Sequence, residues 1–268
     1  MKRRILIFCT LLAALGLTAF GVMNWNDQEA HRAEAASNEE IAMNEPVLGP
    51  KDKEIFTDFI YDVGPRFSPI KKTKVDGAKA VSDFLDADVV ASMASVQSVG
   101  ILLFENEKLT EVLESGTTAA LTDRQLQLLR SFDYSTNFVV RADYRKKNGN
   151  TGILVSDYST PHMTIVPENQ AEYAQGKEVL MTYLKEESKE IWANVDPEKL
   201  QPAKLFFRVT EQGTVEVIRL DRTSGYPEVD EKMIQLISDL PGSWIPAKNA
   251  AGRPVGQELV VSFGLMGC

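Results

Sequence analysis

Two adjacent segments near the C-terminus alternate apolar and polar residues, and this pattern strongly limits the folds open to the chain. The segment from Lys204 to Thr210 keeps one face apolar throughout and the other partly so. A tight-turn signal follows at Gly213, because glycine accepts the positive φ that such turns need. The segment from Thr214 to Asp221 then returns in the opposite direction. The pattern predicts an antiparallel pair of strands.

Helical patterns flank this pair, and a third strand closes the region. Residues 178–191 and 228–240 each repeat apolar side chains at helical spacing, and Pro241-Gly242 ends the second helix. Residues 257–265 alternate again and predict a last strand. The order α-β-β-α-β predicts an α+β domain, in which helices lie on one face of a three-stranded antiparallel sheet.

A set of residues marks the turns and connections of this region in order: Gly213, Ser224, Gly225, Asp230, Trp244, Pro246, Gly252 and Pro254. This motif and the order of the elements resemble the TonB C-terminal domain family over about residues 170–264, within a domain that we assign to residues 168–268. Each matching residue also has a structural interpretation. The residue adopts a backbone conformation that a Cβ would oppose, lies at the start of a helix, packs on the sheet, or stiffens a connection. We therefore interpret the motif as structural and not catalytic.

The resemblance implies a mode of partner binding. In the family, a short extended segment of an outer-membrane receptor adds as a strand beside the last strand of the domain. Main-chain groups then supply the affinity and demand little of side-chain identity. The alternative is that the middle domain or a second chain already covers this edge. The residues implied in partner binding are Gln257, Glu258, Leu259, Val260, Val261, Ser262 and Phe263.

Two departures from the family leave two functions open. Energy-transducing members carry a long Pro-rich span, whereas this chain has only residues 26–50 as a polar tether. These members also use polar residues in the membrane helix to contact a proton-driven motor. In this chain the corresponding apolar run is Ile5–Val22, and Thr10 and Thr18 carry its only hydroxyl groups. One expectation is docking onto an outer-membrane transporter, with energy transmitted for uptake. The alternative is a non-energised periplasmic binding or scaffold module that reuses the fold.

The expected partners follow from these two functions. They are an outer-membrane receptor or transporter, or another envelope protein, and self-association is an alternative. Inner-membrane proton-channel motor subunits are expected only if energy is coupled. The formal charge of −9 disfavours nucleic acid as a partner.

The middle region, residues 51–167, predicts a mixed α+β domain of unknown role. Its clearest signals are a helix over 121–132 with Thr122 as N-cap, and a hairpin around Asn148-Gly149-Asn150. A helical stripe is predicted over 51–63, ended by Gly64-Pro65. Shorter helices are expected over 75–85 and 87–95, and strands over 99–104 and 162–166.

The residues of this region that could act in catalysis or bind a metal form no convincing site. Ser156 and Asp157 near His162 match no known activation geometry and are typical of turns. The acidic residues between Asp83 and Asp88 lack the central glycine and distal glutamate of a calcium loop. We therefore expect no enzymatic activity, no metal and no cofactor.

The N-terminus is predicted to direct export. Lys2-Arg3-Arg4 precede the uncharged run Ile5–Val22, which spans about 27 Å as a helix. Residues 1–25 are thus a membrane anchor, which leaves the body in the periplasm and the N-terminus in the cytoplasm, or a cleaved signal peptide, which leaves a soluble periplasmic protein. Cys9 and Cys268 are the only cysteines, so no disulfide framework is expected.

Overall fold

The computed structural model describes residues 59–105 and 108–265, and these form a mixed α+β structure that is mostly sheet. The predictions for the export segment, for the tether and for both cysteines lie outside the described residues. Within these two ranges, no helix is long and apolar enough to cross a membrane.

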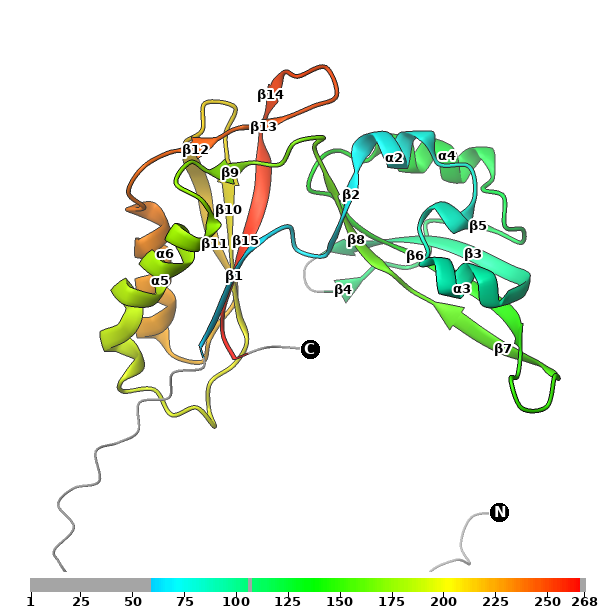
Figure 1. Cartoon of the computed structure of the whole chain (residues 1–268), viewed down its shortest axis with the longest axis horizontal. Coiled ribbons are helices and arrows are strands. Elements are labelled where there is room, and N and C mark those ends of the chain that lie inside the picture. The colour runs from blue at the N-terminus through cyan, green and yellow to red at the C-terminus, as the bar shows by residue number, and fades with distance from the viewer. Residues whose placement is uncertain (1–58, 106–107, 266–268) are drawn as a thin grey trace, which may run out of the picture. The chain divides into compact units, whose positions relative to one another are not determined.

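A four-stranded antiparallel sheet forms the C-terminal region (Figure 1). Its strand order is β1-β15-β10-β11, so β15 lies in the interior of the sheet. The pairing runs from Ala203↔Phe263 to Val209↔Gln257 between β10 and β15. The strands are β1 (Ile60–Gly64), β15 (Gln257–Gly264), β10 (Ala203–Val209) and β11 (Val215–Arg222).

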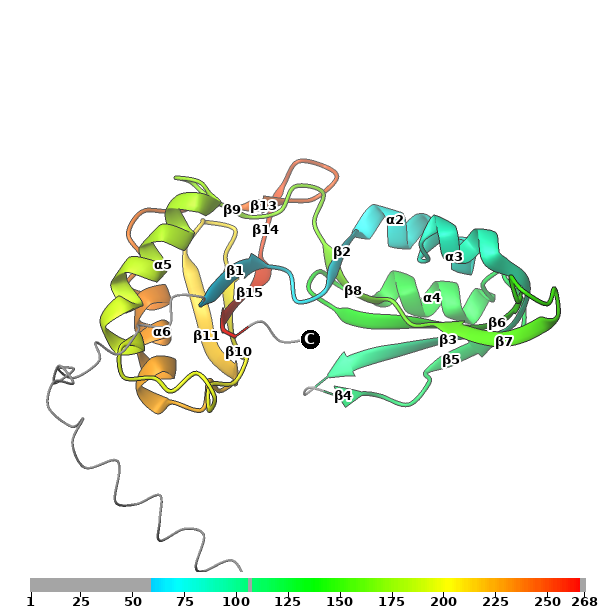
Figure 2. The ribbon, with the colours of Figure 1, turned by 60° about the horizontal axis from the view of Figure 1, so that its bottom comes forward.

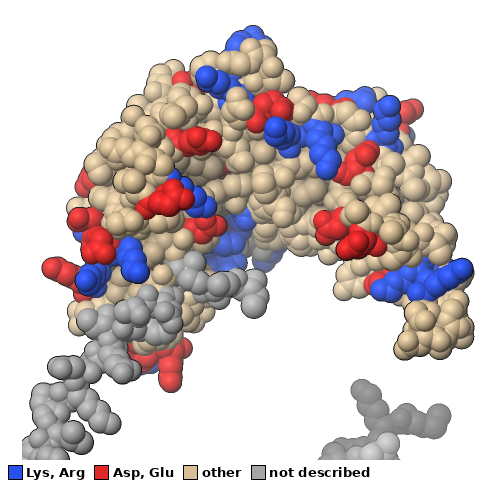
Figure 3. All heavy atoms as spheres, viewed as in Figure 1, with Lys and Arg blue, Asp and Glu red and all other residues tan. Residues whose placement is uncertain are grey.

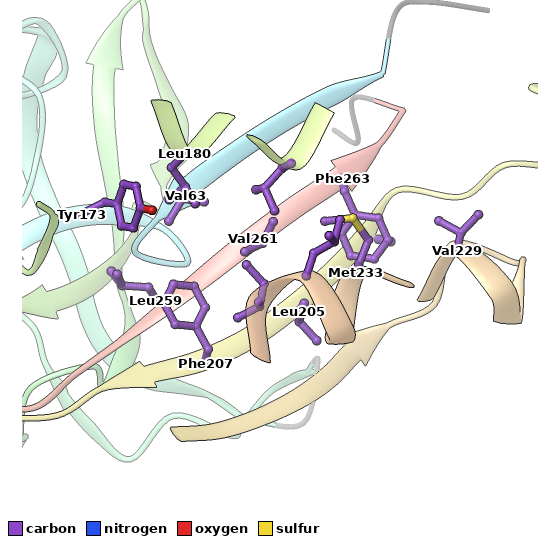
Figure 4. Close-up of a cluster of buried hydrophobic side chains, with 14 of the residues drawn as sticks. Val63, Tyr173, Leu180, Leu205, Phe207, Val229, Met233, Leu259, Val261 and Phe263 are labelled. Carbon is purple, nitrogen blue, oxygen red and sulfur yellow. The ribbon is translucent and has the colours of Figure 1, made fainter. Parts of the chain in front are cut away.

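Two helices, α5 (Lys177–Trp192) and α6 (Pro227–Ser238), cover one face of this sheet (Figure 2). The inward side chains of the strands meet the apolar sides of both helices. Figure 4 shows Val261 and Phe263 of β15 among Leu205 of β10, Met233 of α6 and Leu180 of α5. This buried cluster holds the sheet and the two helices together.

Two short ladders support the end of this sheet. One pairs β9 (Glu172–Tyr173) with β12 (Trp244–Ile245), and the other pairs β13 (Ala247–Lys248) with β14 (Pro254–Val255). Both belong to the connections that lead into α5 and into β15.

A seven-stranded sheet forms the middle region, with its own buried core. The path is β2-β8-β6-β3-β4, while β5 pairs with β3 and β7 pairs with β6. All of these pairs are antiparallel except β2 with β8. The strands are β2 (Ser68–Lys71), β3 (Met93–Glu105), β4 (Lys108–Leu109), β5 (Glu114–Gly116), β6 (Asn137–Lys147), β7 (Leu154–Ser159) and β8 (His162–Val166).

Short helices accompany the seven-stranded sheet. Thr122 caps α4 as predicted: its hydroxyl accepts the backbone N–H of Gln125, and the Gln125 side chain accepts the N–H of Thr122 in return. The helical segments are α2 (Lys72–Gly77), the 3₁₀ turn η1 (Val81–Asp83), α3 (Ala87–Ser92) and α4 (Asp123–Ser131).

Several predicted elements are confirmed within a few residues. These are the helices now seen as α4, α5 and α6, the hairpin of β6 and β7, and the strands β8, β10, β11 and β15. The single helix expected over 75–85 is wrong, because the chain forms α2 and then the separate turn η1.

Two further predictions need correction. The stripe over 51–63 was expected to be helical, yet its described end, Ile60–Gly64, is the strand β1. The C-terminal sheet therefore has four strands and not three. The reason is that Tyr61 and Val63 face the same core as β15, a contact with a distant segment that helical spacing alone does not reveal.

Candidate functional site

The last strand, β15, is the candidate binding edge, and the structure places all seven implied residues on it. On one side β15 pairs with β10 along its length. On its other side β1 pairs antiparallel from Ile60↔Gly264 to Gly64↔Val260. The main-chain edge that a partner strand would use is therefore occupied by the chain itself over Val260–Gly264.

Side chains fasten β1 to α5. The indole Nε1–H of Trp192 donates to the Tyr61 hydroxyl, which also hydrogen bonds with Ser188. The Phe59 ring stacks on the Trp192 ring with centroids 3.9 Å apart. Burial raises the pKa of the Tyr61 hydroxyl, while the hydrogen bonds to Ser188 and Trp192 partly oppose this shift.

Apolar packing and an ion pair add to this attachment. Val63 joins the core beside Val261 and Leu180 (Figure 4). Asp62 pairs with Lys177 at the start of α5, with Nζ 2.6 Å from the carboxylate oxygen. Side-chain hydrogen bonds, apolar packing and an ion pair therefore attach β1 to the rest of the domain, in addition to its pairing with β15.

The remaining end of β15 is also occupied. The backbone N–H of Glu258 donates to the hydroxyl of Ser135, which lies between α4 and β6 of the middle region. The buried Gln257 side chain accepts the N–H of Ala171 at 2.8 Å and donates to Gln170. Contacts from β1 and from the middle region together cover this edge.

The outer strands of the sheet, β1 and β11, have no further partner strand among the described residues, but each carries a feature that opposes strand addition. β1 has only five residues. The pairing of β11 with β10 shifts register twice, between Lys204/Leu205 and between Phe206/Arg208. Short edge strands and bulges are devices by which sheets avoid edge-to-edge pairing.

The motif residues Gly213 and Trp244 act on each other. Gly213 has φ of 77°, as its turn position predicts, and its carbonyl accepts the N–H of Trp244 at 3.2 Å. A Cβ at Gly213 would lie 2.2 Å from the Trp244 carbonyl oxygen. The Trp244 ring is buried against Phe207 and Tyr173, with centroids 5.3 and 5.7 Å away.

Asp230 and Ser224 form a second motif pair, and Asp230 places its charge at the start of α6 as expected. Asp230 lies in the first turn of α6, and its carboxylate binds the preceding loop: it accepts the N–H of Ser224 at 2.9 Å and the hydroxyl of Thr223. Gly225 follows with φ of 85°, as predicted. The pair therefore fixes the loop between β11 and α6.

The other motif residues belong to the connection before β15. Pro246 separates β12 from β13, and Pro254 begins β14. Gly252, with φ of 72°, donates its N–H to the Asn249 carbonyl in the turn between β13 and β14. These contacts are structural.

A cavity of about 700 Å³ is lined by residues of β1, β9, β15 and the start of α5. Its lining includes Val63, Leu180, Leu259 and the buried ring of Trp244. The walls are mainly apolar, and Asp62 and Lys177 also line it.

The other candidate side chains are placed apart from this edge. The Nδ1 of His162 lies 3.0 Å from the Thr160 carbonyl, and its ring contacts Phe67 and Phe104. The Asp83 carboxylate accepts the N–H groups of Lys79 and Ala80. Across the described ranges, no group of three or more His, Cys, Asp or Glu residues could hold a metal ion.

Tyr61 and Val63 are residues of this edge that were not predicted from the sequence. A signal for them exists, since Tyr61 and Val63 alternate with Asp62 and the segment ends at Gly64-Pro65, both features of a short edge strand. The helical spacing of the longer stripe concealed it.

No family model, curated protein or solved structure matches this chain.

Proposed function

We propose that this chain is a non-catalytic binding or scaffold module of the cell envelope, which reuses the fold of the TonB C-terminal domain without energy coupling. The observation that carries the proposal is the pairing of β1 with β15, because it occupies the edge on which TonB-type docking depends. The contact of Ser135 with Glu258 extends the cover beyond β1.

TonB-type docking onto an outer-membrane transporter is the competing function. It requires β1 to leave the sheet, so that Val260–Gly264 offers its main-chain groups to a partner strand. The small size of β1, five residues, favours this candidate because few main-chain bonds hold the strand in place.

An engineered disulfide that reversibly fixes β1 to β15 distinguishes the two functions by experiment. Asp62 and Ser262 are cross-strand neighbours, and Cα atoms of such neighbours lie about 4.5–5.5 Å apart, within the range of a disulfide. The test protein is the full-length double variant Asp62→Cys/Ser262→Cys, with Cys9 and Cys268 replaced by serine. The serine-only chain is the matched control.

Envelope complexes are then isolated with the oxidised and reduced variant, with and without an uncoupler of the proton gradient. The proposal expects the same partners in all four samples. Capture of an outer-membrane transporter by the reduced chain and its loss on oxidation would overturn the proposal in favour of strand exchange. Loss of partners on addition of the uncoupler alone would show that binding depends on the proton gradient. This result would contradict the proposed lack of energy coupling.

A further inference from the structure

The outward face of the C-terminal sheet, opposite α5 and α6, carries an unusual group of positive charges. In β10, Leu205 and Phe207 point to the core, so Lys204, Phe206 and Arg208 point away from it. The register places Arg222 opposite Lys204, and Arg219 opposite Phe206. Like charges directly opposite each other on antiparallel strands are unfavourable.

Phe206 lies at the centre of this group. The guanidinium of Arg219 is 4.5 Å from its ring centroid, and that of Arg66 is 5.2 Å away. Arg66 is itself buried and pairs with Asp221 at 3.1 Å. Arg208 lies near the carboxylates of Glu211 and Glu216, at 3.8 and 3.5 Å. These three carboxylates are therefore already engaged by cations of the group other than Lys204 and Arg219.

Lys204 is compensated less directly than Arg66 is, because only the charge of Asp221 opposes the positive charges around it. It is half-buried, and it makes no ion pair or hydrogen bond with any residue of the described ranges. Burial, and then the charges of Arg66 and Arg222, lower the pKa of its ammonium group, while the charge of Asp221 partly opposes this shift. Arg219 likewise contacts the Phe206 ring and no carboxylate in the part of the chain described here.

The charge of the whole chain makes this group unexpected. The protein carries a formal charge of −9, and acidic and basic side chains are interspersed on the face that Figure 3 presents. A half-buried ammonium is normally in direct contact with a carboxylate, because an unpaired buried charge is costly. Retaining Lys204 among arginines instead favours an anion from outside the chain.

We propose that Lys204 and Arg219, beside the Phe206 ring, form a binding site for a small oxyanion of charge −2, with a phosphate group as its chemical class. The ammonium supplies a point charge and the guanidinium a planar pair of donors, the two modes by which proteins hold phosphate. Arg222 adds to the local positive potential. This site does not require β1 to stay in the sheet or to leave it. The site and the proposed function can therefore be tested independently.

Thermal unfolding of the full chain with inorganic phosphate tests the site, with sodium chloride at matched ionic strength as reference. A dissociation constant on the order of 1 mM predicts a rise in Tm of about 3–5 °C at roughly 10 mM phosphate. The variant Lys204→Met keeps the aliphatic stem and is expected to lose this rise. Without phosphate it is expected to melt higher than the wild type, because the like-charge repulsion is gone.

Lys185→Gln removes one positive charge from the exposed surface of α5 and is the matched control. It should keep the full phosphate response. The proposal is overturned if the wild type shows no specific response, if Lys204→Met keeps the response, or if Lys185→Gln loses it. Should Lys204→Met not fold, Arg219→Gln replaces it with the same expectation for the phosphate response.

A lipid headgroup and a free phosphate share this chemistry, and vesicle sedimentation distinguishes them. Vesicles that contain phosphatidic acid are compared with vesicles of phosphatidylcholine alone. Lys204-dependent binding to the first identifies a headgroup site. A Lys204-dependent response to soluble phosphate without vesicle binding identifies a site for a free ligand, and both results support the proposed chemistry.

Discussion

Gly213 and Gly252 differ in what surrounds them, although both adopt the left-handed backbone region. Gly213 has φ of 77° and sits against the Trp244 carbonyl, whereas a Cβ at Gly252, with φ of 72°, would meet nothing within 4 Å. Strain in φ alone costs about 1 kcal/mol for alanine. The close contact at Gly213 adds to that cost, because backbone atoms of β12 would have to move.

Replacing each glycine by alanine should therefore separate the two effects. Gly252→Ala is expected to lower the free energy of unfolding by about 1 kcal/mol, and Gly213→Ala by at least about 3 kcal/mol. Urea unfolding measures both. Equal losses would contradict a packing role for Gly213 at Trp244.

The strand β1 is the element that decides access to β15, and Tyr61 is its main polar attachment. The raised pKa of Tyr61 means that the folded state holds the phenol proton more tightly than the unfolded chain. Its contribution to stability is fully present below pH about 10, the unfolded value, and is lost as the pH rises through the folded value.

Tyr61→Phe tests this attachment. Removing the hydroxyl leaves the buried Trp192 Nε1–H without its Tyr61 partner, so the free energy of unfolding at neutral pH should fall by about 1–2 kcal/mol. The decline of stability above pH 10 should also become shallower than in the wild type. Denaturant unfolding at neutral pH and in the alkaline range checks both, and an unchanged alkaline decline would count against a role for Tyr61.

The helix predicted for the segment that contains β1 was wrong for an identifiable reason. Phe56, Phe59, Ile60 and Val63 are spaced as on a helix, and local spacing was the only signal available. The strand state depends on Tyr61 and its neighbours pairing with Phe263 and the rest of β15, far along the chain. By contrast α4 and the hairpin of β6 and β7 carry their own cap and turn residues, so local signals were enough.

For the whole molecule, the pair of Arg66 and Asp221 links the two sheets. The Arg66 guanidinium lies over Phe206 of β10 and also 4.8 Å from the ring centroid of Phe104 in β3. The side chains of Arg66 and Asp221 are only 6% and 11% exposed. Removing one partner of a buried pair is costly, because the remaining charge loses the group that pairs with it.

Asp221→Ala is therefore expected to lower the free energy of unfolding by about 3–4 kcal/mol in phosphate-free buffer. The matched variant is Asp62→Ala, whose pair with Lys177 is 64% and 55% exposed and should contribute less than about 1 kcal/mol. Guanidinium or urea unfolding of both variants provides the comparison. Similar losses for the two would contradict a buried linking role for Asp221.

Local sequence signals are sufficient to predict several elements of this fold. The alternation of β10, β11 and β15, the apolar side of α6 and the glycine at the 213 turn all lie within short windows, where side-chain periodicity and backbone sterics act directly. Two features could not be predicted in this way: β1 covers the edge of β15, and Lys204 lies among arginines. Both depend on pairing across the sheet, because register sets which side chains share a face and which main-chain groups remain for a partner.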